Sequence, residues 1–318
     1  MIPEQVADTL RQLRERVATR IVGQEGVIDE ALVGFLARGH VLLEGVPGTA
    51  KTLLVRSLAE ALGVRFGRIQ FTPDIMPSDV TGVSVYRDAT RDFEFRPGPV
   101  FSDVLLADEI NRAPAKTQSA LLEAMQERQV TTDGQARSLG EVFTVFATQN
   151  PVEYEGTYPL PEAQLDRFLL KVRVTYPSRD AELELLARYA EGFDAERLGE
   201  RPIAPVVDRK GCHELRAAVD AVKVAPEVRE YVAAIVRATR EDPGLTLGGS
   251  PRATVSLFRA ARGAALLAGR DFATPDDVKD FAPAVLRHRI ILAPELEVEG
   301  RSADDVLDGV LGRVPAPQ

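Results

Sequence analysis

The residues with the clearest chemical potential lie between positions 45 and 52, in the order Gly-Val-Pro-Gly-Thr-Ala-Lys-Thr. Gly45 and Gly48 let the backbone curl so that successive N–H groups point at one anion, and a following helix adds the positive end of its dipole. In such a loop Lys51 reaches terminal phosphates and the hydroxyl of Thr52 joins the shell of a Mg²⁺ ion. The stretch predicts a site for a nucleoside triphosphate. The plainer alternative is a glycine-rich turn between a strand and a helix.

The residues expected to bind the nucleotide here are Gly45, Val46, Pro47, Gly48, Thr49, Ala50, Lys51, Thr52 and Leu53. Ala50 departs from the usual loop, which carries glycine before the lysine. Because alanine disfavours positive φ, we expect Ala50 to enter the helix with right-handed geometry.

Two adjacent carboxylates, Asp108 and Glu109, follow the apolar run 104–107. That run has the composition of a buried parallel strand, and ligands of open α/β sheets bind at the carboxyl ends of such strands. We therefore expect Asp108 to hold Mg²⁺, directly or through water, and Glu109 to polarise the attacking water.

Further polar residues stand where the chain leaves or enters an element. Asn150 ends the apolar strand 142–148 and is expected near the γ-phosphate, where it could orient water. Arg167 follows Asp166, and the pair could also be a local ion pair. Arg252 opens a helix, where the dipole does not favour a cation, so an anion-facing role is the more plausible one.

The elements that must position these residues alternate in the first half of the chain. Helical spacing over 4–19 and 25–38 precedes the phosphate loop, and the turn 21–23 between them either folds over the adenine or simply joins two helices. After helix 51–62 come strand 65–71, helix 115–127 and strand 169–174. Two β-hairpins are expected at about 83–95 and 129–139. The first is either a surface hairpin or an insertion that contacts a partner.

From about residue 176 onward we expect only helices, over 179–192, 213–222, 226–240, 251–268, 275–288 and 302–311. Thr274 and Ser302 have the pattern of helix N-caps. The boundary separates an α/β domain, 1–177, from a helical domain, 178–318.

Composition limits the alternatives. The net charge of −9 opposes non-specific binding of nucleic acid. We expect no membrane span, because no run of about 18 apolar residues occurs, and no signal peptide. The single cysteine, Cys212, fits a reducing cytoplasm. Beside His213 in a polar stretch, it is expected to be an ordinary surface residue.

In this order, Asp108-Glu109, Asn150, Arg167 and Arg252 after a phosphate loop resemble the AAA+ ATPases, and most closely the MoxR family. The stretches 45–52, 68–82, 108–114 and 148–168 carry the likeness, including Ala50, and 68–82 is specific to that branch. The resemblance implies a P-loop core whose parallel sheet has the strand order 5-1-4-3-2, followed by a helical lid.

The resemblance also implies roles. Lys51 and Thr52 correspond to Walker A, Asp108 and Glu109 to Walker B, and Asn150 to the first sensor. Arg167 corresponds to an arginine finger that reaches the neighbouring subunit, and Arg252 to a second sensor swung in by the lid. Ile21, Val22 and Gly23 would line the adenine pocket, and Gln70 could gate Glu109.

The expected function is therefore hydrolysis of ATP to ADP with Mg²⁺ in a homo-oligomeric ring of six, with chaperone-like remodelling of a protein client. Family likeness implies a partner with a von Willebrand factor A domain and roles in metal insertion or complex assembly. Two alternatives stay open, a nucleotide-dependent binding switch with little turnover and a DNA-associated motor.

Overall fold

The structure is a computed structural model that describes residues 3–89, 91–151, 156–193 and 202–317. The first two residues, Thr90 in the expected hairpin tip and the last residue lie outside the described part.

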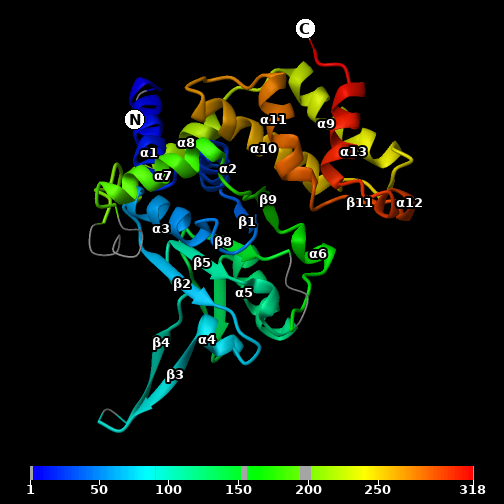
Figure 1. Ribbon diagram of the computed structural model, residues 1–318. Coiled ribbons are helices and arrows are strands. Elements are labelled where there is room, and N and C mark those ends of the chain that lie inside the picture. Colours follow the sequence, from blue (N-terminus) through cyan, green and yellow to red (C-terminus); the bar gives the residue numbers. More distant parts are fainter. Residues whose placement is uncertain (1–2, 90, 152–155, 194–201, 318) are drawn as a thin grey trace.

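A five-stranded parallel sheet forms the centre of the first half of the chain (Figure 1). Its strands follow one another as β2-β5-β8-β1-β9. In chain order these are strands 2, 3, 4, 1 and 5, so the predicted order 5-1-4-3-2 is confirmed. The strands are β1 (His40–Glu44), β2 (Phe66–Gln70), β5 (Val104–Asp108), β8 (Thr144–Gln149) and β9 (Phe168–Arg173).

The central strands are almost wholly buried, as their apolar runs require, and helices cover the sheet. These are α2 (Glu25–Leu36), α3 (Lys51–Ala61) and α5 (Ala115–Glu127), while α1 (Pro3–Ala18) packs on α2 and α3. The short helices α4 (Pro77–Thr81), η1 (Ile110–Arg112) and α6 (Glu162–Leu165) lie in the connections. Each predicted helix of this half is present.

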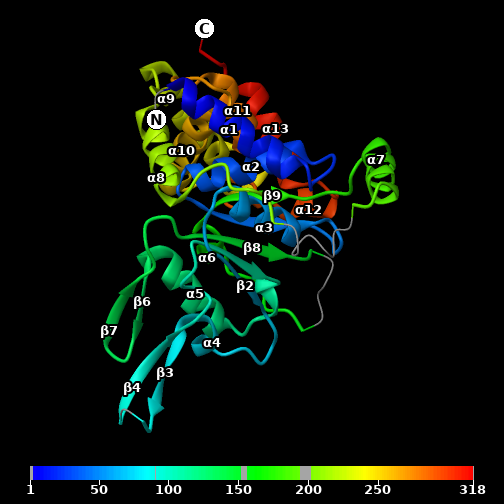
Figure 2. The same cartoon turned by 90° about the vertical axis from the view of Figure 1, so that its left-hand side faces the viewer.

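Both expected hairpins are also present. β3 (Gly82–Arg87) pairs with β4 (Asp92–Pro97), and β6 (Gln129–Thr132) pairs with β7 (Gln135–Ser138). The first hairpin projects far from the body in both views (Figures 1 and 2). It carries the exposed side chains of Tyr86 and Phe93, and Ser84 bonds the Asp133 carboxylate of the second hairpin.

The second half is helical, with one exception to the prediction. Its helices are α7 (Arg179–Ala190), α8 (Arg209–Ala221), α9 (Pro226–Glu241), α10 (Pro251–Leu267), α11 (Pro275–Leu286), α12 (Pro294–Val298) and α13 (Ala303–Arg313). The expectation of helices alone was wrong, because β10 (Leu245–Leu247) and β11 (Ile291–Leu292) form a small antiparallel sheet. Two or three residues are too short for a period-2 pattern to reveal. Thr274 and Ser302 both cap their helices in full capping boxes.

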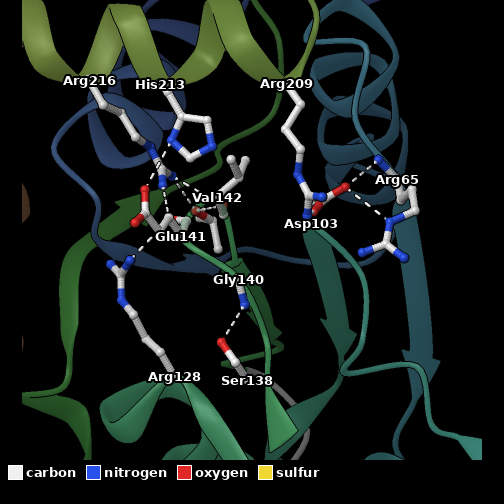
Figure 3. Close-up of polar contacts among 11 residues, drawn as sticks. Arg65, Asp103, Arg128, Ser138, Gly140, Glu141, Val142, Arg209, His213 and Arg216 are labelled. Atoms are coloured by element: carbon white, nitrogen blue, oxygen red, sulfur yellow. Dashed lines mark hydrogen bonds and ion pairs between the residues drawn. The ribbon is translucent and has the colours of Figure 1, made fainter.

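The helices of the two halves share one hydrophobic core. A single cluster of buried residues runs from α1, α2 and β1 into α8, α9, α10 and α11. Two arginines of α8 contact the sheet (Figure 3). Arg216 donates to the carbonyl oxygens of Glu141 and Val142 and to the hydroxyl of Thr144. Arg209 forms an ion pair with Asp103. The second half is therefore docked on the edge where the strands begin.

Cys212 lies in this core and is fully buried, so the expectation of a surface residue was wrong. It occupies the inner face of α8, and burial raises the pKa of its thiol to about 12. His213, one residue on, has a half-exposed side chain. Within the described residues, no helix is long and apolar enough to cross a membrane.

Candidate nucleotide site

The phosphate loop joins β1 to α3 at the carboxyl edge of the sheet. Lys51 folds back into it, and its ammonium donates to the carbonyl oxygens of Gly45 at 2.8 Å and Val46 at 2.7 Å and to the Thr49 hydroxyl at 3.2 Å. Burial lowers the pKa of Lys51, while the carboxylates of Asp108 and Glu109 act in the opposite direction. The ammonium is thus held at the loop with two carboxylates in electrostatic range.

Ala50 corrects one prediction. Its φ of 61° and ψ of 20° are left-handed, so it does not enter α3 with right-handed geometry. For a residue with a Cβ this conformation costs about 1–2 kcal/mol. Gly48, two residues before it, also has positive φ, at 83°, so the loop makes two left-handed turns.

The turn 21–23 and the phosphate loop both contact the segment that follows β9. Gly45 packs so closely on the Val174 carbonyl that an added Cβ would lie 2.3 Å from its oxygen. Gly23 has a φ of 68°, and a Cβ added to it would lie 2.3 Å from the Cβ of Ala181 and 3.9 Å from that of Pro177. Ile21 itself is buried. Both segments therefore pack against parts of the stretch 174–181, and the adenine role of residues 21–23 stays a prediction.

Asp108 is the centre of a polar cluster at the end of β5. Its Oδ2 lies 3.4 Å from the Thr52 hydroxyl, and its Oδ1 accepts from the Thr148 hydroxyl at 2.7 Å. Arg68, on the neighbouring strand β2, donates to the same Oδ2 from Nη2 at 2.7 Å. The cluster thus joins the loop to three strands.

Glu109 follows Asp108 and has left-handed backbone geometry, with φ at 57°. The Thr148 hydroxyl accepts its backbone N–H at 2.8 Å. Its Oε2 accepts from Gln70 at 2.8 Å and pairs with Arg112 at 3.0 Å. The contact that the Gln70 hypothesis requires is therefore present. Since Arg68 also donates to the Gln70 Oε1 at 3.0 Å, one chain of contacts links the two carboxylates.

These groups fit a magnesium ion. The donor set combines a hydroxyl and a carboxylate, the oxygen ligands that Mg²⁺ prefers. Arg68 already places a cation on Asp108 Oδ2, which shows that this oxygen attracts positive charge. Thr52 and Asp108 would hold the ion, and Arg68 would have to move off that oxygen.

Asn150 is buried just beyond β8, at the same edge. The carbonyl of Gln149 before it accepts the Gly45 N–H at 3.2 Å, so the end of β8 touches the phosphate loop directly. The loop, both carboxylates and Asn150 are thus gathered on one edge of the sheet.

Arg167 and Arg252 lie on the opposite edge. Both line a cavity that also includes His40 and Leu169, at the beginnings of β1 and β9. Arg252 approaches Asp166 at 3.5 Å, beside Arg167. The phosphate loop begins only after Glu44, and at about 3.3 Å a residue the strand separates the two edges by roughly 13 Å. Arg252 therefore lies away from the loop of its own chain in this structure, and its role as a second sensor stays a prediction.

Sequence reasoning missed three residues of the carboxyl edge, Arg68, Arg112 and Thr148. Arg68 had a usable signal, because residues 68 and 70 alternate onto one face of β2 and Gln70 was already a candidate. Arg112 and Thr148 contact Glu109 because the backbone at Glu109 is left-handed. No local sequence pattern predicts that turn.

The strand order, the phosphate loop and the paired carboxylates at one sheet edge define an AAA+ ATPase. Residues 40–170 match the family described as "ATPase family associated with various cellular activities (AAA)", and residues 237–310 match the AAA lid domain. The chain is 48% identical to Uncharacterized protein YeaC of Bacillus subtilis, over 95% of this chain and 93% of that one. It is 45% identical to Chaperone MoxR1 of Mycobacterium tuberculosis, over 98% of this chain and 83% of the relative.

A crystal structure from Cytophaga hutchinsonii, of a protein with a provisional ATPase name, superposes with a TM-score of 0.90. The two chains are 40% identical, and the match covers 99% of this chain and 97% of the other. The chain belongs to the MoxR family of AAA+ ATPases.

Proposed function

We propose that the protein hydrolyses ATP to ADP and phosphate with Mg²⁺. The observation that carries this is the gathering of Lys51, Asp108 and Glu109 at one edge of the sheet. Lys51 binds phosphate oxygens in exchange for the loop carbonyls that it now contacts. Mg²⁺ supplies neutralisation of phosphate charge when bound between Thr52 and Asp108.

In this proposal Glu109 accepts the proton of the attacking water, after its carboxylate leaves Gln70 and Arg112, and Asn150 orients that water. Ile21, Val22 and Gly23 contact the adenine. Residues 1–177 act as the nucleotide domain and 178–318 as the lid.

We further propose that Arg167 and Arg252 act on the nucleotide of a neighbouring chain. Their place on the edge opposite the phosphate loop supports this, since one chain cannot bring both edges to one phosphate. Repeating such a contact head to tail closes a ring, which we expect to contain six chains. In this proposal Arg252 acts across the interface between chains rather than on the nucleotide of its own chain.

The ring would act in the cytoplasm as a chaperone-like remodelling factor on a protein client. The relative named Chaperone MoxR1 supports that class of function. A partner with a von Willebrand factor A domain, in metal insertion or complex assembly, remains the most specific form of the proposal.

Steady-state ATPase rates over a range of protein concentrations test the proposal, for wild type and Arg167→Ala. We expect a specific activity that rises as chains associate and is lost in the variant. A flat, low rate in both proteins would instead support a nucleotide-dependent binding switch.

A further inference from the structure

Helix α7 presents an apolar face to solvent. Leu183 is 52% exposed and Leu186 66%, and Ala187 and Ala190 continue the same face at helical spacing. The structure describes all of α7, and Ala181 is its only buried residue. We call Leu183, Leu186, Ala187 and Ala190 the outward stripe. Contiguous apolar surface of this kind marks a site of interaction.

The outward stripe points away from the body of the molecule. Because successive helix positions turn by about 100°, Ala181, Leu185 and Arg188 form the opposite side of α7. On that side Ala181 packs beside Gly23, and Arg188 donates to the carbonyl oxygen of Thr19 at 2.8 Å. A helix that is apolar on both sides is normally covered on both sides. The body of the chain therefore supplies one of two partners of α7.

A second apolar surface lies in a cavity of about 670 Å³ between α6 and the sheet of β10 and β11. We call it the apolar cavity; its apolar lining residues are Ala163, Leu245, Leu247, Pro251, Ile290 and Ile291. Leu247 is 48% exposed there, so this surface also lacks a cover.

The two surfaces lie on opposite sides of one chain, as a head-to-tail contact requires. Figure 1 shows α7 at the left of the molecule and α6 and β11 at the right. α7 begins in the stretch 174–181, which packs on the phosphate loop. The apolar cavity shares Asp166 and Arg289 with the cavity that Arg167 and Arg252 line. A contact that brings Arg167 to a neighbour's phosphate loop therefore brings the apolar cavity towards that neighbour's α7.

Charge favours this pairing over contact between two α7 helices. Asp180 and Glu191 border the outward stripe on one side, and Glu182 borders it on the other. Two such stripes would bring like charges together. The charged residues that line the apolar cavity are balanced: Arg240, Arg289, Glu162 and Asp166. That lining accepts an apolar stripe with acidic borders.

We propose that the outward stripe docks in the apolar cavity of a second copy of this chain, with its two leucines against β10. The inference rests on the proposed ring and assigns the surfaces that hold neighbouring chains together. Because every copy carries both surfaces, the contact repeats from chain to chain. It supplies apolar burial, whereas Arg167 and Arg252 would act on phosphate.

Sedimentation over a range of protein concentrations, with a non-hydrolysable ATP analogue, measures the contact. Leu183→Gln/Leu186→Gln should weaken association about tenfold or more, because two leucines no longer leave water, and glutamine retains the helix. Leu247→Gln should also weaken association. Phe272→Gln is the control, since Phe272 is 51% exposed and lines a different cavity. Thermal melting of all variants should match wild type, because each position is exposed.

Cross-linking between chains identifies the two surfaces directly. Chains with Leu186→Cys are mixed with chains with Leu247→Cys and treated with a short bifunctional maleimide. The native Cys212 is fully buried, and burial raises the pKa of its thiol to about 12, so it does not compete. We expect a linked dimer in this mixture and none when Phe272→Cys replaces Leu247→Cys. Linkage of Leu186→Cys chains to one another would overturn the proposal in favour of paired α7 helices.

The outcomes separate the contact from the ring. Association of wild-type strength in both leucine variants, without the cross-link, would overturn the contact and leave the ring. Wild-type chains that stay monomeric at every concentration would overturn both. Hydrolysis of ATP by such monomers would then show that catalysis itself does not depend on assembly.

Discussion

The two edges of the parallel sheet differ in how their charges are balanced. At the carboxyl edge, Arg68 and Arg112 each pair with a carboxylate, and Lys51 lies in electrostatic range of both. At the other edge Arg128 and Arg259 donate to backbone carbonyls, with the carboxylates of Glu141 and Asp220 only in electrostatic range. The first edge can exchange its ion pairs for a ligand, whereas at the second edge we propose that Arg167 and Arg252 act on a nucleotide of another chain.

The largest effect that would test this difference concerns Arg167. In the associated protein, Arg167→Ala should lower the ATPase rate by about 10³–10⁵, the range for arginines supplied across an interface. The affinity of dilute chains for ATP should not change, because Arg167 lies far from the loop of its own chain. Rates and fluorescent-nucleotide binding measure the two quantities, with Arg229→Ala as the control.

Mixing Arg167→Ala with Lys51→Ala chains sharpens the same comparison. Each variant keeps the edge that the other has lost, so some sites in a mixed ring should contain both an intact loop and an intact arginine. We expect activity to reappear on mixing. A mixture as inactive as its components would show that the two edges do not meet.

Glu109→Gln should have the next largest effect. Loss of a positioned base typically costs about 10²–10⁴ in rate, and the glutamine keeps the size of the side chain, so nucleotide binding should survive. Single-turnover hydrolysis and equilibrium binding would be compared, with Glu230→Gln at an exposed position on α9 as the control. Unchanged turnover would remove Glu109 from the role of base.

Lys51→Ala should weaken ATP binding by roughly 10- to 100-fold, because one charged hydrogen-bond donor to phosphate is lost. Lys279→Ala, on α11, is the matched control. Equal affinities in titrations of a fluorescent ATP analogue would contradict the assignment.

The carboxyl edge was largely predictable from sequence, and the arginine edge was not. A glycine-rich loop and an acidic pair after an apolar strand are local patterns, and parallel strands bring such ends together. Arg38, Arg128, Arg259 and Arg289 come from four separate segments, and only the docking of the later helices brings them to one cavity. The edge that Arg252 faces could not be predicted for the same reason, since the start of a helix indicates nothing about it.

The residues with left-handed backbone conformation were not predicted, for a different reason. Ala50 and Glu109 adopt a conformation that their side chains disfavour, because the surrounding contacts decide the turn. The sheet of β10 and β11 was not predicted because its strands are too short to show a period-2 pattern. The burial of Cys212 was not predicted because α8 begins at Arg209, earlier than the apolar spacing indicated.

A smaller effect is expected at Arg68, which occupies the oxygen of Asp108 that a metal ion would use. Arg68→Gln should lower the Mg²⁺ concentration needed for nucleotide binding about fivefold, because Arg68 is half-exposed and two unit charges about 4 Å apart in water repel by roughly 1 kcal/mol. Magnesium titrations of fluorescent-nucleotide binding measure it. Arg65→Gln is the control, since Arg65 pairs with Asp103 instead. A higher magnesium requirement in Arg68→Gln would mean that Arg68 positions Asp108 rather than competing for it.

The smallest effect concerns the left-handed turn at Ala50. Ala50→Gly removes a conformational cost of about 1–2 kcal/mol in the folded loop, but glycine also gains about 0.4–1 kcal/mol of freedom in the unfolded chain. The free energy of unfolding measured in urea should therefore rise by between zero and about 1.6 kcal/mol. Ala50→Val should fall below wild type, because a β-branched residue tolerates positive φ least. If valine were as stable as alanine, the left-handed turn would not be imposed by the loop, and the explanation for Ala50 would fail.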